Sequence, residues 1–280
     1  MTSAQRANPS QEEPTSLSFF TTGDGIKIAY RTDGPADLPA LVLANSIATT
    51  LHMWDDQVPE LSKHFRVIRY DYRGHGGSDV PAGAYSDGRL GRDVLELMDH
   101  LGIERTHFLG LSLGGFIGQW LAIHAPERID RLVLANTASH LGPADYFDTA
   151  IRKVLAAEDM KDTAEGFLHN WFPLAMIEAN RPIVHRFRQD LLHTPRQGLA
   201  GLFAAVRDAD LRRTIALIQS PTLVIGGKFD TVTSYAMSEA IAAGIPGARL
   251  KGFPAVHLTN IEFPEEFTDE VLAFLKSDQA

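Results

Sequence analysis

Short apolar runs alternate with longer stretches of helical spacing along most of the chain. A short, nearly continuous apolar run is typical of a strand that is buried on both faces of a parallel sheet. Such runs occupy residues 40–44, 67–70, 107–109, 132–135 and 222–225, with a last one around 248–253. Between them, residues 88–101 and 115–124 have helical patterns, and the runs 17–21 and 26–30 predict an antiparallel hairpin. The alternation predicts an α/β fold with a mostly parallel sheet and helices on both faces.

The alternation is interrupted between residues 140 and 210. This stretch has helical patterns, for example at 146–155, 163–171 and 183–192, and no convincing strand. Because it stands between two buried strands, it predicts a helical cap over the carboxyl edge of the sheet, where open α/β sheets bind ligands. Longer crossover helices are the alternative interpretation. We therefore expect a core formed by residues 17–139 and 211–280 and a cap formed by residues 140–210.

Composition narrows the possible functions. The chain has 35 Asp and Glu against 26 Lys and Arg, and its net charge of −9 disfavours nucleic acid and anionic membranes as partners. It has no cysteine, which excludes disulfides, thiol catalysis and cysteine-ligated metals. No apolar stretch approaches the roughly 20 residues that cross a bilayer. Residues 1–16 are expected to be a disordered tail and not a signal peptide. Together these features predict a soluble cytoplasmic protein and give no indication of its oligomeric state.

The segment Gly110-Leu111-Ser112-Leu113-Gly114 is the strongest chemical signal. It follows the apolar run 106–109 and precedes the apolar helix pattern 115–123. A serine on a sharp turn between a strand and a helix has a strained backbone and a projecting hydroxyl. The flanking glycines fit because side chains there would collide with the neighbouring strand and helix. A helix-capping serine is the alternative, but it does not call for a glycine on each side. We expect Ser112 to be a nucleophile.

A nucleophilic serine needs a histidine base and an acid that orients the base. With a serine on this kind of turn, the acid and then the histidine follow it along the chain. Asp230 comes just after the strand pattern 223–227, whereas the run ending at residue 135 is followed by the uncharged Asn136 and Thr137. His257 is the histidine that follows Asp230, and it lies between the last strand pattern and the last helix pattern, 267–275. Ser112, Asp230 and His257 are therefore the predicted catalytic residues.

The reaction also needs two N–H groups that stabilise the developing oxyanion. The backbone amide after the nucleophile, that of Leu113, is one candidate. The second should come from the loop after the strand 40–44, where the sequence reads Asn45-Ser46-Ile47-Ala48-Thr49. Its position favours the Ile47 amide.

From residue 17 to about residue 276, the chain resembles the α/β-hydrolase superfamily, and within it the 3-oxoadipate enol-lactonases. The resemblance rests on the serine turn, on the acid and histidine positions and on several shorter strings. These strings are Asn45-Ser46-Ile47, Leu51-His52-Met53-Trp54-Asp55, Tyr70-Asp71-Tyr72-Arg73-Gly74-His75-Gly76, the 132–137 strand end, and His257-Leu258-Thr259-Asn260-Ile261-Glu262. The chain departs from the family at Ile47-Ala48-Thr49 and at Val256, where Leu-Gly-Thr and glycine are common.

The resemblance implies a serine hydrolase that opens a five-membered enol-lactone ring in aromatic catabolism without a cofactor. The partner would be a small-molecule lactone or ester. Because the family's lactone carries a carboxylate, we expect a cation from the cap, from among Arg152, Arg181, Arg186 and Arg188, although solvated surface charge explains each of them as well. Trp171 and Phe172 are expected to line the substrate pocket, with core packing as their alternative role.

Other functions fit the same residues. A general carboxylesterase would use them on acyclic esters, and a C–C bond hydrolase or a perhydrolase would use the same three side chains. A ligand receptor built on a hydrolase fold is an alternative from a different class, which the intact Ser112, Asp230 and His257 disfavour. A dehalogenase would need aspartate in place of Ser112.

Overall fold

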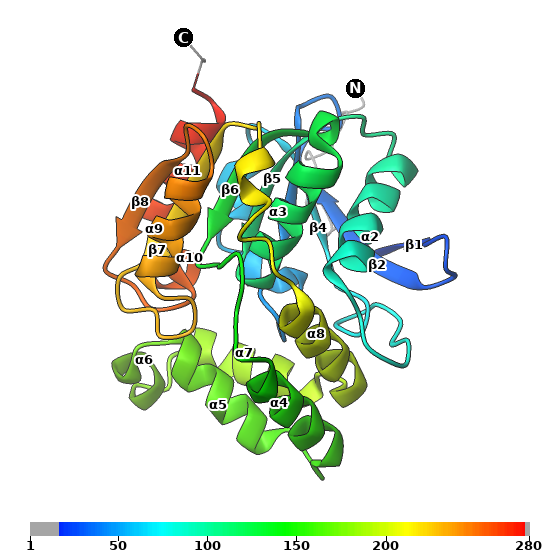
Figure 1. The fold of residues 1–280 in the computed structure, drawn as a ribbon, viewed down its shortest axis with the longest axis vertical. Helices are drawn as coiled ribbons and strands as arrows, with labels where there is room; N and C mark the ends of the chain where they lie inside the picture. Colours follow the sequence, from blue (N-terminus) through cyan, green and yellow to red (C-terminus); the bar gives the residue numbers. More distant parts are fainter. Residues whose placement is uncertain (1–16, 278–280) are drawn as a thin grey trace, which may run out of the picture.

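A single twisted sheet runs through the centre of the molecule (Figure 1). The computed structural model describes residues 17–277, in which eight strands pair in the order β1-β2-β4-β3-β5-β6-β7-β8. The pairs β1–β2 and β2–β4 are antiparallel, and the other neighbouring strands are parallel. The strands are β1 (Ser18–Thr21), β2 (Lys27–Asp33), β3 (Ala40–Ala44), β4 (Arg66–Tyr70), β5 (Thr106–Leu111), β6 (Ile129–Ala135), β7 (Thr222–Gly227) and β8 (Arg249–Phe253). The predicted hairpin and mostly parallel sheet are confirmed, whereas the tail predicted for residues 1–16 lies outside the described residues.

Helices cover both faces of the sheet, as predicted. The core helices are α1 (Val58–Leu61), α2 (Asp87–His100), α3 (Leu113–His124), α9 (Tyr235–Gly244), α10 (Thr259–Glu262) and α11 (Pro264–Leu275). Short 3₁₀ turns lie at Leu51–Trp54, Pro126–Arg128 and Ile215–Leu217. None of the helices found between residues 17 and 277 combines the length and the apolar character that crossing a bilayer requires.

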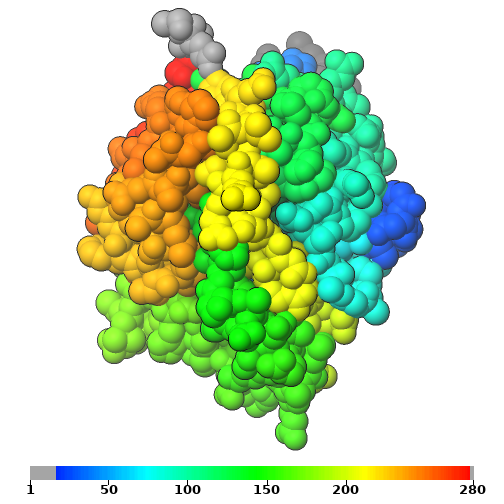
Figure 2. All heavy atoms as spheres, in the orientation of Figure 1, coloured from blue at the N-terminus to red at the C-terminus, as the bar shows by residue number. Residues whose placement is uncertain are grey.

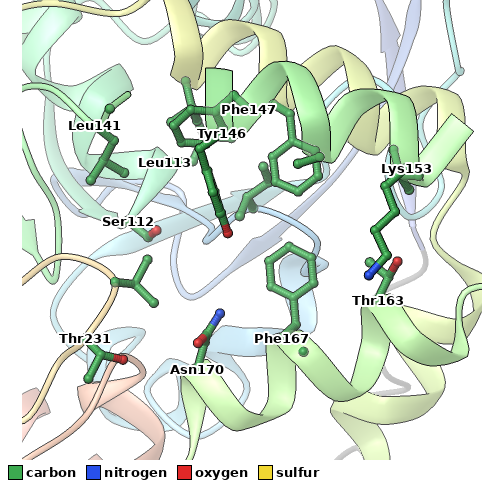
Figure 3. Close-up of a pocket in the computed structure, with 18 of the residues that line it drawn as sticks. Ser112, Leu113, Leu141, Tyr146, Phe147, Lys153, Thr163, Phe167, Asn170 and Thr231 are labelled. Carbon is green, nitrogen blue, oxygen red and sulfur yellow. The ribbon is translucent and has the colours of Figure 1, made fainter. Parts of the chain in front are cut away.

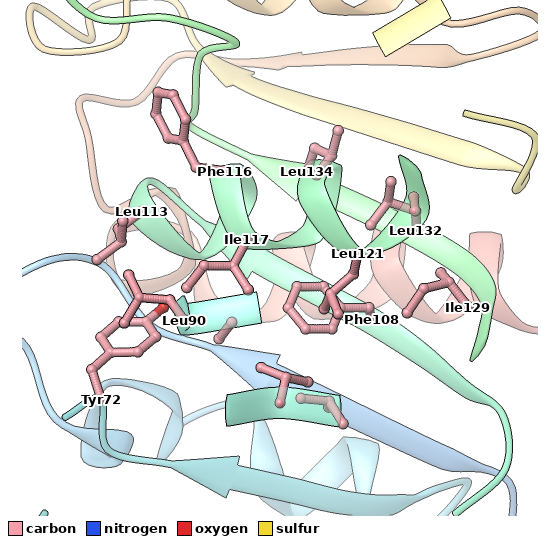
Figure 4. Packing of buried hydrophobic residues seen from close by; sticks show 14 of the residues in the cluster. Tyr72, Leu90, Phe108, Leu113, Phe116, Ile117, Leu121, Ile129, Leu132 and Leu134 are labelled. Carbon is pink, nitrogen blue, oxygen red and sulfur yellow. The ribbon is translucent and has the colours of Figure 1, made fainter. Parts of the chain in front are cut away.

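The strands divide their side chains between two hydrophobic clusters. Successive residues of a strand point to opposite faces, so Phe108 and Leu132 pack under α3 on one face, whereas Leu109 and Val133 pack against the α11 side on the other. Figure 4 shows the first cluster, in which Ile117 and other residues of α3 cover the strand residues. This burial on both faces explains why the parallel strands appear in the sequence as continuous apolar runs.

A cap of five helices, among the described residues, lies between β6 and β7 in the sequence. These are α4 (Ala144–Ala156), α5 (Lys161–Trp171), α6 (Leu174–Glu178), α7 (Pro182–His193) and α8 (Arg196–Asp208). They form the lower, mostly green layer in Figures 1 and 2, next to the carboxyl ends of the parallel strands. The cap therefore covers the edge of the sheet at which the sequence predicts a ligand site.

The two chain segments that enter and leave the cap are paired. His140 and Asp210 form an isolated antiparallel bridge, and the Leu211 amide donates to the Ser139 carbonyl over 2.7 Å. Between these two segments in the sequence, α8 meets the core at Gly198, where an added Cβ would lie 1.9 Å from the Gly74 carbonyl oxygen. Only glycine permits so close an approach of the two backbones.

Candidate active site

Ser112 occupies a strained turn between β5 and α3. Its backbone has φ 58° and ψ −114°, a conformation that non-glycine residues rarely adopt. The surrounding glycines make the turn possible: an added Cβ would lie 2.1 Å from the Gly114 carbonyl oxygen at Gly110, and 2.2 Å from the Ala44 carbonyl oxygen at Gly114. The side chain of Thr137 also donates to the Ser112 carbonyl over 2.7 Å. These contacts hold the serine at the carboxyl edge of the sheet, beside the cap.

Asp230 and His257 form a buried pair next to this edge. His257 Nδ1 lies 2.8 Å from Asp230 Oδ2, and the side chains are 1 % and 0 % exposed. The other carboxylate oxygen, Oδ1, accepts hydrogen bonds from the backbone amides of Val232 and Thr233, over 2.8 and 3.0 Å. The structure thus brings together the acid and the base that the sequence predicts, on the loops after β7 and β8.

Asp230 is held in its ionised form. Burial alone would raise the pKa of this carboxyl, but the His257 ring and the hydrogen bonds from Asn136 and the Thr233 amide outweigh burial. The net pKa of Asp230 is therefore lower than its ordinary value. A fixed negative charge on this side of the ring favours the proton on Nδ1 and leaves Nε2 free to act as a base.

Asn136 is a part of the site to which the sequence analysis gave no role. It follows β6 with a positive φ of 41°, and its Nδ2 donates to Asp230 Oδ2 and to the Val256 carbonyl, each over 3.1 Å. Asn136 therefore ties the acid to the loop that carries His257. Thr233, on the same loop as Asp230, fixes the carboxylate itself, because its hydroxyl donates to Asp230 Oδ2 over 2.8 Å. The sequence signal for Asn136 is its position at the end of a strand, but an uncharged residue there does not by itself indicate a role in catalysis.

Ile47 and Leu113 both line the cavity next to Ser112, as the predicted oxyanion donors should. No hydrogen bond from either amide to another group is found within residues 17–277. The loop that carries Ile47 is held against α3, since the Gly114 amide donates to the Asn45 carbonyl over 3.0 Å. Trp54 Nε1 in turn donates to the Asn45 side chain over 2.9 Å. The loop is fixed by buried contacts on both sides.

The cavity has a volume of about 500 Å³ and lies between the serine turn and the cap. Its walls come mainly from α4 and α5, with Phe203 of α8 and the loop after β7 (Figure 3). Most of the lining is apolar, and Ser112, Asn170 and Thr231 are among its polar groups. The cavity is therefore suited to a small or medium-sized, partly apolar molecule.

Trp171 and Phe172, which were expected to line this cavity, are not among its lining residues. Each is 2 % exposed, and both rings pack against Phe187 of α7, with centroids 5.9 and 5.3 Å away. Trp171 also packs against the cavity-lining Phe167, with ring centroids 4.9 Å apart, so it supports the cavity wall from behind. Trp171 still contacts the site through its backbone, because its carbonyl accepts a hydrogen bond of 3.4 Å from the Leu258 amide.

The four cap arginines do not line the cavity either. Arg186 pairs with Asp55 and Arg188 with Glu165, which joins α7 to the core and to α5 respectively. Arg152 donates to Thr149 of its own helix, and Arg181 is exposed at the start of α7. The cation that does line the cavity is the neighbour of Arg152 on α4, Lys153.

Within the described part of the chain, no three His, Cys, Asp or Glu side chains are grouped so that they could hold a metal ion. The chemistry available at the site is that of a serine, a histidine and a carboxylate, with two backbone amides at the same cavity.

A serine on a strand–helix turn, followed along the chain by an acid and a histidine on the same edge of a mostly parallel sheet, defines the α/β-hydrolase class. The chain belongs to the alpha/beta hydrolase fold family, which it matches over residues 39–264. It is therefore a hydrolase.

Three relatives are similar over nearly their whole length. A hydrolase of Pseudomonas aeruginosa PA01 is 60% identical, with a TM-score of 0.93, covering 95% of this chain and 100% of that one. The enol-lactonase from Burkholderia xenovorans LB400 is 38% identical, with a TM-score of 0.90, covering 93% of this chain and 100% of that one. The 3-oxoadipate enol-lactonase 2 of Acinetobacter baylyi is 37% identical over 255 residues, which are 91% of this chain and 95% of that protein.

Proposed function

We propose that the protein is a cytoplasmic serine hydrolase that opens an enol-lactone ring through an acyl-enzyme intermediate. The observation that carries this proposal is the buried Asp230–His257 pair, 2.8 Å apart, at the same edge of the sheet as the strained Ser112. The similarity to two enol-lactonases over more than nine tenths of the chain supports the choice of a lactone.

In the first half of the reaction, Ser112 Oγ attacks the lactone carbonyl carbon while His257 Nε2 accepts the hydroxyl proton. The amides of Ile47 and Leu113 stabilise the oxyanion of the tetrahedral intermediate. The ring C–O bond then breaks and expels an enolate, which takes up the proton and becomes a ketone. The opened chain remains bound to Ser112 as an ester.

In the second half, His257 takes a proton from water, and the resulting hydroxide attacks the ester carbonyl. The bond between the acyl carbon and Ser112 Oγ breaks, His257 returns the proton to Oγ, and the product leaves as a keto acid. Asp230 remains ionised throughout and orients the imidazole, consistent with its lowered pKa. No cofactor takes part in these steps.

Acyclic carboxylic esters are a second candidate substrate class. The same residues would cleave them by the same steps, and the aromatic lining by Phe147, Phe167 and Phe203 suits the acyl chain or aryl group of such an ester. The relative activities on the two classes distinguish the candidates.

The test compares purified wild-type protein with Ser112→Ala on 3-oxoadipate enol-lactone and on p-nitrophenyl acetate and octanoate. We expect a higher kcat/KM on the enol-lactone, and a loss on the order of 10⁶ in kcat when the nucleophile is removed. Higher kcat/KM on the aryl esters would favour the carboxylesterase. Activity close to wild type in folded Ser112→Ala would refute the mechanism.

A further inference from the structure

We propose that the outer end of the cavity is an anion subsite formed by Lys153, and that the protein accepts lactones or esters with a carboxylate beyond an apolar arm. This proposal rests on the proposed function only in that Ser112 acts on a carboxylic ester or lactone. It adds a substrate class and a specificity-determining residue to the site described above.

Two cap helices make the cavity long. One face of α4 lines it with Tyr146, Phe147, Ala150, Lys153 and Val154, and one face of α5 with Asp162, Thr163, Gly166, Phe167 and Asn170. A helix rises about 1.5 Å per residue, so Phe147 to Lys153 spans about 9 Å of wall and Asp162 to Asn170 about 12 Å. In Figure 3, Ser112 and Thr231 lie at one end of this slot and Lys153 and Thr163 at the other.

The middle of the slot is aromatic. The rings of Phe167 and Phe203 stack with centroids 6.2 Å apart, and Phe147 lies 6.2 Å from Phe203. These rings offer apolar contact to the part of a substrate that lies beside them, whereas the Tyr146 hydroxyl and the Asn170 amide project into the slot closer to Ser112 (Figure 3). A substrate that occupies the whole slot therefore has an apolar arm in this position.

The outer end of the cavity carries a charged side chain, that of Lys153. Figure 3 shows the Lys153 amino group extending across the slot toward Thr163 of the facing helix. Lys153 is exposed and forms no ion pair within residues 17–277, whereas Lys161, at the start of α5, is paired with Asp159. An unpaired ammonium group beside a hydroxyl supplies donors for a carboxylate. Asp162 lines the same end and opposes an anion there, so its removal should have the opposite effect from that of Lys153.

The position of Lys153 sets the kind of anion. A carboxylate attached close to the reacting ring would remain near Ser112, at the inner end of the slot. Lys153 instead suits an anion about one slot length away from the scissile carbonyl, on the far side of the aromatic wall. The length of the apolar arm is thus a variable that an experiment can change.

The kinetic test uses p-nitrophenyl monoesters of adipic, suberic and sebacic acid, each compared with the fatty-acid ester of the same chain length. The measured quantity is the ratio of kcat/KM for the acid to kcat/KM for its neutral analogue. In the wild-type protein this ratio should rise from adipate to sebacate.

The variants test which side chain causes the rise. Lys153→Met should lower the sebacate ratio about tenfold through KM, and 0.5 M NaCl should reduce the difference between this variant and the wild type. Asp162→Asn should raise it. Arg152→Met, on the same helix but outside the lining, is the matched control and should leave it unchanged.

A binding test does not depend on turnover. Monomethyl sebacate is titrated by calorimetry into Ser112→Ala and into the double variant Ser112→Ala/Lys153→Met, and the second should bind about tenfold more weakly. Equal affinities, or an equal effect of Lys153→Met on acids and neutral esters, would overturn the subsite. A preference for amino-terminated esters would do the same, because it would assign the outer end to Asp162. If binding depends on Lys153 but no lactone or ester is hydrolysed, the proposed function fails and the subsite stands.

Discussion

Replacing Asp230 by asparagine should reverse the hydrogen-bonding role of His257 without moving it. The two backbone amides that donate to Asp230 Oδ1 require an acceptor at that position. The side-chain oxygen of the asparagine must therefore take the Oδ1 position, which places its NH₂ group at the position of Oδ2. There it faces His257 Nδ1, which would have to become an acceptor and carry its proton on Nε2 instead.

An imidazole in that tautomer cannot accept the proton of Ser112. The corresponding change in a serine protease lowers kcat by about 10⁴, equivalent to about 5 kcal/mol in the activation free energy. We expect a loss of the same order here. The side chains of His257 and Asp230 are 1 % and 0 % exposed, so water cannot replace the lost hydrogen bond between them. The NH₂ group would also face the donors of Asn136 and Thr233, so some loss of stability should accompany the loss of rate.

The assay measures kcat on the best substrate of the panel above, with circular dichroism and thermal melting to establish that the variant is folded. Asp37→Asn, an exposed loop substitution, is the control for the chemical change itself. A folded Asp230→Asn protein that keeps kcat within about tenfold of wild type would show that Asp230 does not orient the base.

Three further results are expected. Gly114→Ala should destabilise the protein by about 1–3 kcal/mol in denaturant unfolding, because its Cβ would lie 2.2 Å from the Ala44 carbonyl oxygen; an unchanged unfolding midpoint would contradict this. Burial lowers the pKa of His75 in the folded protein to about 4. In the unfolded chain the pKa has its ordinary value near 6.5, so as the pH falls below 6.5 the unfolded chain binds a proton that the folded chain does not. Stability should therefore fall by about 2 kcal/mol between pH 7.5 and pH 5 from this group alone, and His75→Asn should show a correspondingly smaller loss; equal losses in the two proteins would refute the assignment. EDTA should leave kcat/KM unchanged, since the proposed steps use only Ser112, His257 and Asp230; activity lost with EDTA and restored by a divalent metal would refute the mechanism.

The strands could be predicted because burial on both faces of the sheet requires a continuous run of apolar residues in the sequence. The run 40–44 is the strand β3 itself, and the run 132–135 is the continuous buried part of β6, which is preceded by the charged Asp130 and Arg131. Ser112 could be located for a similar reason, since its two glycines are required by backbone contacts that no other residue permits. The Gly110 contact lies within the turn itself, and although the Gly114 contact is with Ala44 of β3, the glycine that it requires is visible in the sequence.

The cavity lining could not be predicted in the same way. Phe167 and Trp171 lie on one helix and are equally suited to core and cavity, and only the position of α7 determines that Trp171 packs away from the substrate. Lys153 and Arg152 differ by one residue and about 100° of helix rotation. The role of Asn136 could not be predicted, because it depends on a contact with Asp230, which is 94 residues farther along the chain. Each of these outcomes depends on tertiary contacts.

The contact between Gly198 and Gly74 has a consequence for the timing of events in turnover. Because the two backbones touch, helix α8 is seated on the core as soon as the chain has folded. The wall that carries Phe203 is then already in place when a substrate arrives, and no binding energy is consumed in docking it. The position of α8 is thus fixed once, when the chain folds, whereas an enzyme with a hinged cover must close that cover again in every catalytic cycle.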